Sequence, residues 1–265
     1  MDIFLKELDI SYLSFKANKA PILNELTIQY KDFAYWQKQF LTGDILEEQL
    51  NYWHNKLMGV EPLALPTDYP RPAKPDYKGR DITFEINIDT SRKLRDFAKS
   101  TGSTLYGVLL GGLYVLLNKY TGQEDIVIGT PIANRHYTQL ENLIGFFVNT
   151  LAIRKQIPLN NTFRELILSL QNDLVEAQTH QDIPFEKLVE SLKLEKDQSR
   201  HPIFQIMFSL QTFGKQHFQY LKPVDLGEDK YSPAQFDISL ILSENGDQLQ
   251  GILNYATSLF NTSTA

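Results

Sequence analysis

Five of the twelve prolines in this 265-residue chain lie between residues 58 and 80, and they separate two parts with different patterns. Proline fixes φ and has no backbone N–H, so this density predicts an extended connector rather than a helix or a central strand. Before the connector, apolar residues recur at helical spacing in residues 1–17, 30–40 and 44–57. After it, helical stretches mix with stretches of strand pattern.

The second part predicts a mixed sheet covered by helices, because its elements follow no strict β-α-β rhythm and no repeat. Strands are expected at 82–88, 125–129, 146–153, 203–210, 236–242 and 249–255. Helices are expected at 89–98, 104–121, 162–179 and 184–194. Acidic residues at helix starts suggest N-caps, namely Asp44, Asp89 and Asp182. The predicted fold class is α/β.

Composition excludes several classes of function. Lys and Arg number 26 against 32 Asp and Glu, so nothing favours binding to nucleic acid or to a membrane surface. The chain has no cysteine, which excludes disulfides and thiolate nucleophiles and fits a cytoplasmic location. Its five histidines are isolated, so no metal site is predicted. Phosphate-binding glycine loops, a G-x-S-x-G elbow and a signal peptide are absent from the sequence.

Two polar patches stand within apolar patterns. Residues 30–36 read Y-K-D-F-A-Y-W, a helix start in which Asp32 favours the helix dipole and the aromatic residues fill a core. Residues 144–154 read I-G-F-F-V-N-T-L-A-I-R. A strand seldom holds an Asn and a Thr unless they bond something across a groove or mark a bulge, and Gly145 permits close backbone approach.

Two further patches are polar turns. Residues 180–186 read H-Q-D-I-P-F-E, in which Asp182 and Pro184 suit a helix start and His180 suits the C-terminal dipole of the preceding helix. No partner for a catalytic His180 is identifiable. Residues 197–205 form a loop before a strand, in which an internal ion pair is expected for Arg200.

In order and spacing, the four patches resemble motifs of the condensation domains of non-ribosomal peptide synthetases. The strings are Y-x-D-F-A-x-W, I-G-x-F-V-N-T-x-x-x-R, H-Q-D-x-P-F-E and S-R-x-P. The stretches 65–72 and 125–131 also look typical of the family. The resemblance implies a chloramphenicol-acetyltransferase-like mixed sheet flanked by helices, forming one lobe of a two-lobe, V-shaped domain.

The resemblance also implies an activity. Such domains join aminoacyl or peptidyl thioesters that carrier proteins present on phosphopantetheine arms, and no cofactor is bound directly. The implied partners are carrier proteins, the N-terminal lobe of the same domain and a neighbouring adenylation domain. The family's catalytic motif, H-H-x-x-x-D-G, is absent from this sequence, so no residue is predicted to be catalytic. We therefore expect a C-terminal-lobe fragment that is inactive alone.

By the same resemblance, residues 1–26 are a remnant helix of the N-terminal lobe and 27–265 are the C-terminal lobe. Within it, 27–80 form the crossover and connector and 81–265 the core. A floor loop is expected at 129–135 and a latch at 218–236. Residues expected near the tunnel or lobe interface are Gly129, Thr130, Pro131, Asn149, Thr150 and Arg154. Residues expected to hold structure are Tyr30, Asp32, Trp36, His180, Gln181, Asp182 and Arg200.

Three alternatives stay open. An epimerisation or cyclisation relative shares the implied fold, although the Asn149–Thr150 pair favours condensation. A non-catalytic module that binds carrier proteins needs no catalytic histidine. A freestanding acyltransferase that uses coenzyme A needs one that this sequence lacks.

Overall fold

The computed structural model describes residues 2–158, 160–193, 197–211, 221, 224 and 232–265. Its helices are α1 (Asp2–Lys16), α2 (Tyr30–Phe40), α3 (Gly43–Leu57), α4 (Ile88–Thr101), α5 (Leu105–Thr121), α6 (Phe163–Thr179) and α7 (Phe185–Leu192), with a 3-10 turn, η1, at Thr138–Leu140. Its strands are β1 (Gly79–Ile86), β2 (Asp125–Ile132), β3 (Asn149–Gln156), β4 (Ile206–Gln211), β5 (Ile238–Asn245) and β6 (Gln248–Ala256). The extended connector lies between α3 and β1, as its prolines predict.

The six strands form one mixed sheet in the order β1-β6-β5-β4-β2-β3. The pairs β4–β5 and β2–β4 are parallel, and the other three are antiparallel. In the β2–β3 pair, Ile132 lies opposite Asn149 and Asp125 lies opposite Gln156. The predicted mixed α/β sheet is confirmed, and this register decides which motif residues share an end of the sheet.

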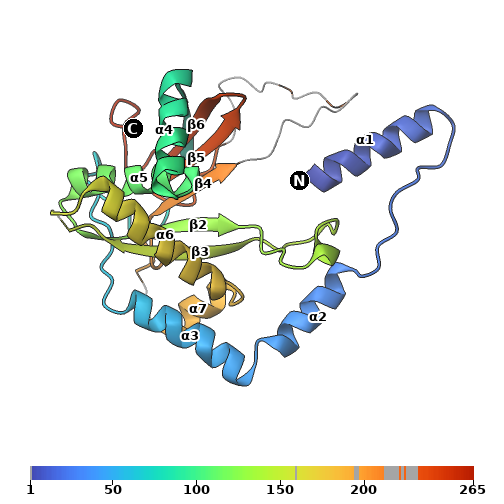
Figure 1. The fold of residues 1–265 in the computed structure, drawn as a ribbon, viewed down its shortest axis with the longest axis horizontal. Helices are drawn as coiled ribbons and strands as arrows, with labels where there is room; N and C mark the ends of the chain where they lie inside the picture. The colour runs from blue at the N-terminus through green and yellow to red at the C-terminus, as the bar shows by residue number, and fades with distance from the viewer. Residues whose placement is uncertain (1, 159, 194–196, 212–220, 222–223, 225–231) are drawn as a thin grey trace.

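Helices flank the sheet (Figure 1), and α4, α5, α6 and α7 each bury part of their surface. Helices α4, α5 and α6 pack on one another, with α4 also on β6 and α6 on β3, while α7 packs on α3 and β3. The core between them includes fully buried Tyr114 and Leu110 of α5, Ile128 of β2 and Phe208 of β4. Helix α3 contributes Trp53, which is 1% exposed.

Helix α1 differs from the other helices because none of its residues is buried. Its apolar stripe, predicted from helical spacing, presents side chains that are between 41% and 65% exposed, namely Phe4, Leu8, Tyr12 and Phe15. Figure 1 shows α1 apart from the sheet, at the far end of the extended segment 17–29. The stripe therefore presents apolar surface of the kind that marks an interface.

The predictions that Asp44 and Asp89 are N-caps are wrong, because each true N-cap lies two residues earlier in the sequence. Helix α3 begins after Thr42, and helix α4 begins after Asn87, whose side chain accepts from the Thr90 N–H. Both acidic residues instead lie in the first helical turn, where the helix dipole also favours negative charge.

Within the described residues, no single helix is long and apolar enough to cross a membrane. Only α4 and α5 taken together meet that criterion, and they are bent by 105° at the break between them.

Candidate functional site

Helix α2 holds the loop that connects β2 to β3. The Tyr30 hydroxyl donates to the carbonyl oxygen of Phe146 at 3.0 Å. The rings of Tyr30 and Phe33 lie 5.2 and 4.8 Å from that of Phe147, measured between centroids. A Cβ on Gly145 would lie 2.3 Å from the Tyr30 ring, so this position requires glycine. The predicted close approach at Gly145 is therefore an approach to an aromatic ring of α2.

Two other residues of the first patch act as the sequence suggests. The Asp32 carboxylate accepts from the Gln29 N–H at 2.8 Å and caps the start of α2. The Trp36 ring packs edge-on against Tyr137 of the β2–β3 loop, at 5.3 Å between centroids. The aromatic residues of α2 therefore contact the β2–β3 loop at two places, through Tyr30 at the start of the helix and through Trp36 two turns later.

Arg135 organises the same loop from within. Its guanidinium donates to the carbonyl oxygens of Leu140 and Leu143, the second at 2.8 Å, and lies 4.2 Å from the centroid of the Phe147 ring. Burial lowers the pKa of Arg135 from its usual value. The loop is therefore tied by a cation to its own backbone and by aromatic rings to α2.

Asn149 joins the second patch to the third. The side chain is 8% exposed, and its Nδ2 donates to the carbonyl oxygens of Gln181 at 2.9 Å and Ile183 at 2.8 Å. Its Oδ1 accepts from the Phe185 N–H at 3.0 Å and from the Thr150 N–H at 2.9 Å. All four bonding positions of this amide are used within the chain. The groove across which Asn149 was expected to bond is therefore occupied by the chain's own α6–α7 turn.

This contact corrects the expected start of α7. Asp182 is not the N-cap, because α7 starts at Phe185 and Pro184 occupies the cap position. Proline has no side-chain acceptor, and the free N–H of Phe185 is satisfied by Asn149 from a distant strand. The Asp182 carboxylate instead lies 3.7 Å from His136 Nε2 in the β2–β3 loop.

Three neighbouring positions on β2 and one on β3 complete this end of the sheet. Gly129 is buried, and a Cβ there would lie 2.2 Å from the Phe204 ring. Thr130 is 5% exposed and accepts from the Tyr106 hydroxyl at 2.7 Å, while burial raises the pKa of Tyr106 to about 12. Pro131 is exposed and lies opposite half-buried Thr150. Pro131 and Thr150 are thus the two residues of this set that reach the surface.

Arg154 lies elsewhere. It is opposite Val127, near the other end of β3 from Asn149. Its Nε and Nη2 bond Asp125 at 2.8 and 2.5 Å, and its Nη1 donates to the carbonyl oxygens of Lys56 and Met58. The structure does not bring Arg154 together with Asn149, because every donor group of its guanidinium holds the end of α3 and the start of β2.

Replacing Arg154 by lysine should lower the free energy of unfolding by about 1–2 kcal/mol, since an ammonium cannot make the bidentate contact and reach both carbonyls. Urea denaturation followed by circular dichroism measures the change. Arg92 is an exposed arginine on α4, and its replacement by lysine should change stability by less than about 0.5 kcal/mol. Equal effects at the two positions would contradict this account of Arg154.

His180 ends α6, as its position in the sequence suggests. Its ring stacks on that of Tyr52, with centroids 3.9 Å apart, and its Nδ1 lies 2.9 Å from the carbonyl oxygen of Glu176. The carbonyl oxygen of His180 accepts from Trp53 Nε1 at 2.7 Å. His180 and the neighbouring Gln181 carbonyl are therefore parts of the contact between α3, α6 and β3.

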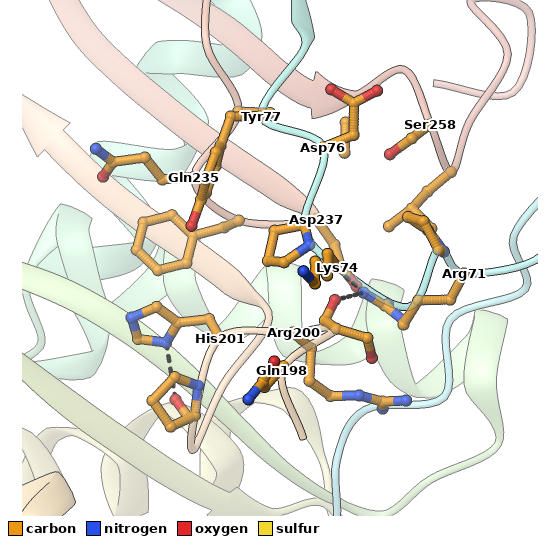
Figure 2. Close-up of a pocket in the computed structure, with 18 residues that line it drawn as sticks. Arg71, Lys74, Asp76, Tyr77, Gln198, Arg200, His201, Gln235, Asp237 and Ser258 are labelled. Atoms are coloured by element: carbon orange, nitrogen blue, oxygen red, sulfur yellow. Dashed lines mark hydrogen bonds and ion pairs between the residues drawn. The ribbon is translucent and has the colours of Figure 1, made fainter. Parts of the chain in front are cut away.

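Arg200 belongs to a different part of the molecule. Its Nε lies 2.6 Å from the Asp197 carboxylate, which is the internal ion pair expected from the loop sequence. It lines a pocket that the sequence patterns did not reveal, because four distant segments form it (Figure 2). The floor of this pocket is an ion pair between Arg71 and Asp237.

Two expectations have limits set by the described residues. The predicted latch at 218–236 lies outside them except for 221, 224 and 232–236. Among the residues described, no group of three or more His, Asp or Glu side chains is arranged to hold a metal ion.

Comparisons with known proteins identify the fold and the family. The model of the condensation-domain family matches residues 1–265. Gramicidin S synthase 2 of Brevibacillus brevis is 41% identical over 268 residues, which is 99% of this chain and 6% of that protein. A chain in the complex of the X-domain and OxyB from teicoplanin biosynthesis superposes with a TM-score of 0.87 at 28% identity, covering 100% of this chain and 60% of that one. A four-domain nonribosomal peptide synthetase bound to AMP and glycine superposes with a TM-score of 0.80 at 29% identity. The match covers 100% of this chain and 21% of that one.

The mixed sheet and its flanking helices are thus a chloramphenicol-acetyltransferase-like α/β fold. The chain belongs to the condensation-domain family of nonribosomal peptide synthetases. It spans only 6% of the length of the gramicidin S synthase that it matches.

Proposed function

We propose that this chain is part of a condensation domain that forms a peptide bond between two carrier-bound thioesters. The amine of one aminoacyl group attacks the thioester carbonyl of the other, so that a C–N bond forms, the C–S bond breaks and the amine loses a proton. The displaced phosphopantetheine sulfur leaves as a thiol. The observation that carries the proposal is Asn149, which ties two family motifs, residues 144–154 and 180–186, into one end of the sheet.

We propose that the chain is divided between two lobes. Residues 27–265 would form the C-terminal lobe, and 1–26 would be a remnant helix of the N-terminal lobe, which carries H-H-x-x-x-D-G. The apolar stripe of α1 supports this division, since none of the residues of this helix is buried and Phe4, Leu8 and Phe15 remain exposed. Pro131 and Thr150 would border the substrate tunnel. The end of β2 and the following loop, 129–135, would form the floor of the tunnel, and the α2 aromatic residues would position the rest of the β2–β3 loop.

Because the sequence lacks the H-H-x-x-x-D-G motif, the proposal can be tested by supplying that motif on a separate N-terminal lobe. The 265-residue chain alone should form no peptide bond between two loaded carrier proteins, as followed by mass spectrometry of the carrier-bound products. Adding a separately expressed N-terminal lobe that contains H-H-x-x-x-D-G should produce the dipeptidyl thioester. The same lobe with both histidines replaced by alanine is the control. Product formed by the chain alone, or equally well with the control lobe, would refute the proposal.

A second candidate is a non-catalytic interaction module. It is favoured by the fold similarity to the X-domain in the complex with OxyB and by the missing histidine motif. Under this alternative, the chain would bind a partner protein with the same affinity whether or not the N-terminal lobe is present. The complementation experiment would then give no product in any mixture.

A further inference from the structure

A pocket of about 620 Å³ lies at the end of the sheet opposite Asn149. Its walls come from residues 71–77 before β1, 198–202 before β4, 234–237 before β5 and 256–259 after β6. Strands β4 and β2 are parallel, and Asn149 pairs with the last residue of β2, so the starts of β4 and β5 are at the other end. Asn149 does not line the pocket, but His201 of its wall stacks on Phe185, whose N–H bonds Asn149. The volume of the pocket is in the range of small-molecule sites.

The floor of the pocket is a built structure. Arg71 Nη1 donates to Asp237 Oδ1 at 2.9 Å, its Nη2 also bonds this carboxylate, and the two side chains are 18% and 8% exposed. The backbone of Asp237 is fixed on both sides by bonds to Gln205 and Ala256. Arg71 and Asp237 neutralise each other, so they form a rigid floor without net charge.

Two cationic side chains line the pocket besides that ion pair. They are Lys74 and Arg200, which share the pocket with one further carboxylate, Asp76, while the guanidinium of Arg200 is paired with Asp197. Within the described part of the chain, Lys74 Nζ has no hydrogen-bond or ion-pair partner. Arg200 is paired with Asp197 through Nε, so its two terminal nitrogens are available to donate to a ligand. Burial lowers the pKa of His201, so the imidazole is neutral at pH 7 and adds no charge. Figure 2 shows Lys74 near the middle of the pocket and Arg200 among the side chains that line it.

An aromatic surface accompanies the two cations. Tyr77 is 57% exposed and lines the pocket, as do Gln235 and Phe236. An exposed tyrosine ring beside a cavity is a platform on which a planar ring can stack. The combination of two cations and one open aromatic face selects a ligand that has both a flat ring and a compact negative group.

We propose that this pocket binds an aromatic phosphate ester, with its phosphate between Lys74 and Arg200 and its ring against Tyr77. A phosphate dianion matches two cationic side chains and makes charge-assisted hydrogen bonds with both. Binding of this ligand is measured without peptide-bond formation, so the failure of this proposal and the failure of the proposed function are separate results.

Isothermal titration of the 265-residue chain with phenyl phosphate tests the site, with inorganic phosphate and phenol as the two halves of the ligand. Phenyl phosphate should bind at millimolar concentration or below, more tightly than either half. The K74E variant should weaken it about tenfold, because attraction becomes repulsion. The Y77A variant should reduce the affinity for phenyl phosphate to that for inorganic phosphate. Both side chains are exposed, so the fold should survive, as circular dichroism can verify.

The matched control is K187E, which makes the same charge change at an exposed position of α7 outside the pocket. It should leave the affinity for phenyl phosphate unchanged. The proposal is overturned if the native chain does not bind phenyl phosphate, or if K74E and K187E have the same effect. It is also overturned if inorganic phosphate binds the native chain as tightly as phenyl phosphate does.

Discussion

Replacing Asn149 by leucine should lower the free energy of unfolding by about 4 kcal/mol, because several buried polar groups lose their partners at once. The carbonyl oxygens of Gln181 and Ile183 and the N–H of Phe185 all bond this one amide. Each buried group left without a partner costs about 1–3 kcal/mol. Leucine is close to asparagine in size, so the loss reports hydrogen bonding rather than a cavity. Urea denaturation followed by circular dichroism measures it.

Two further variants sharpen this result. Asn149→Asp keeps the acceptor for Phe185 but replaces the donor to two carbonyls with a second acceptor, so it should also be strongly destabilising. Asn55→Ala, at an exposed position of α3, should change stability by less than about 0.5 kcal/mol. Hydrogen exchange should show that α7 loses protection first in the Asn149 variants. A loss below about 1 kcal/mol in Asn149→Leu would show that the α6–α7 turn does not depend on this contact.

Replacing Trp53 by alanine should cost about 3–5 kcal/mol, the range for a large aromatic residue in a packed core. The side chain is 1% exposed and contacts the ring of Tyr52. Its Nε1 also donates to the carbonyl oxygen of His180, which would be left without this partner. Both losses act on the same contact between α3 and the end of α6. The midpoint of urea denaturation should fall accordingly, with little change in the slope.

Trp36 provides the matched control, since it is half-buried on α2 and packs on Phe40 and Tyr137. Trp36→Ala should cost about half as much as Trp53→Ala, because less apolar area returns to water. Trp53→Phe keeps most of the packing and removes the hydrogen bond, so it should fall between the native chain and Trp53→Ala. Equal losses in the two alanine variants would contradict the assignment of Trp53 to the core.

Local patterns were sufficient to predict the type and order of the helices and strands but not all of their bounds. The strand expected at 146–153 is β3 at Asn149–Gln156, and the strand expected at 82–88 is β1 at Gly79–Ile86. Thr162 stands at the N-cap of α6, and its side chain accepts from the Glu165 N–H, so the start of this helix is specified within four residues. The alternation of apolar residues around Ile82 and Phe84 predicts β1 in the same way. The prediction of N-caps at Asp44 and Asp89 was wrong because an acidic residue is favourable both at the N-cap and in the first turn of a helix.

Contacts between distant segments could not be predicted. The pattern of residues 144–154 indicates that Asn149 bonds something, but only the fold brings the α6–α7 turn to it. Arg154 follows Asn149 by five residues and yet lies at the other end of the strand, since each strand residue advances about 3.3 Å. The Lys74–Arg200–Tyr77 pocket needs four segments whose approach depends on sheet order.

The pairing of β1 with β6 has a consequence for synthesis of the chain. Gly79 to Ile86 pair with Ala256 to Leu249, and β1 is an edge strand with no other neighbour among the described strands. During translation β1 therefore leaves the ribosome long before its partner exists, and its apolar residues remain uncovered until about 170 further residues have been added. Folding of this sheet should accordingly be completed late, and a nascent chain stalled before β6 should be the species that chaperones and proteases recognise.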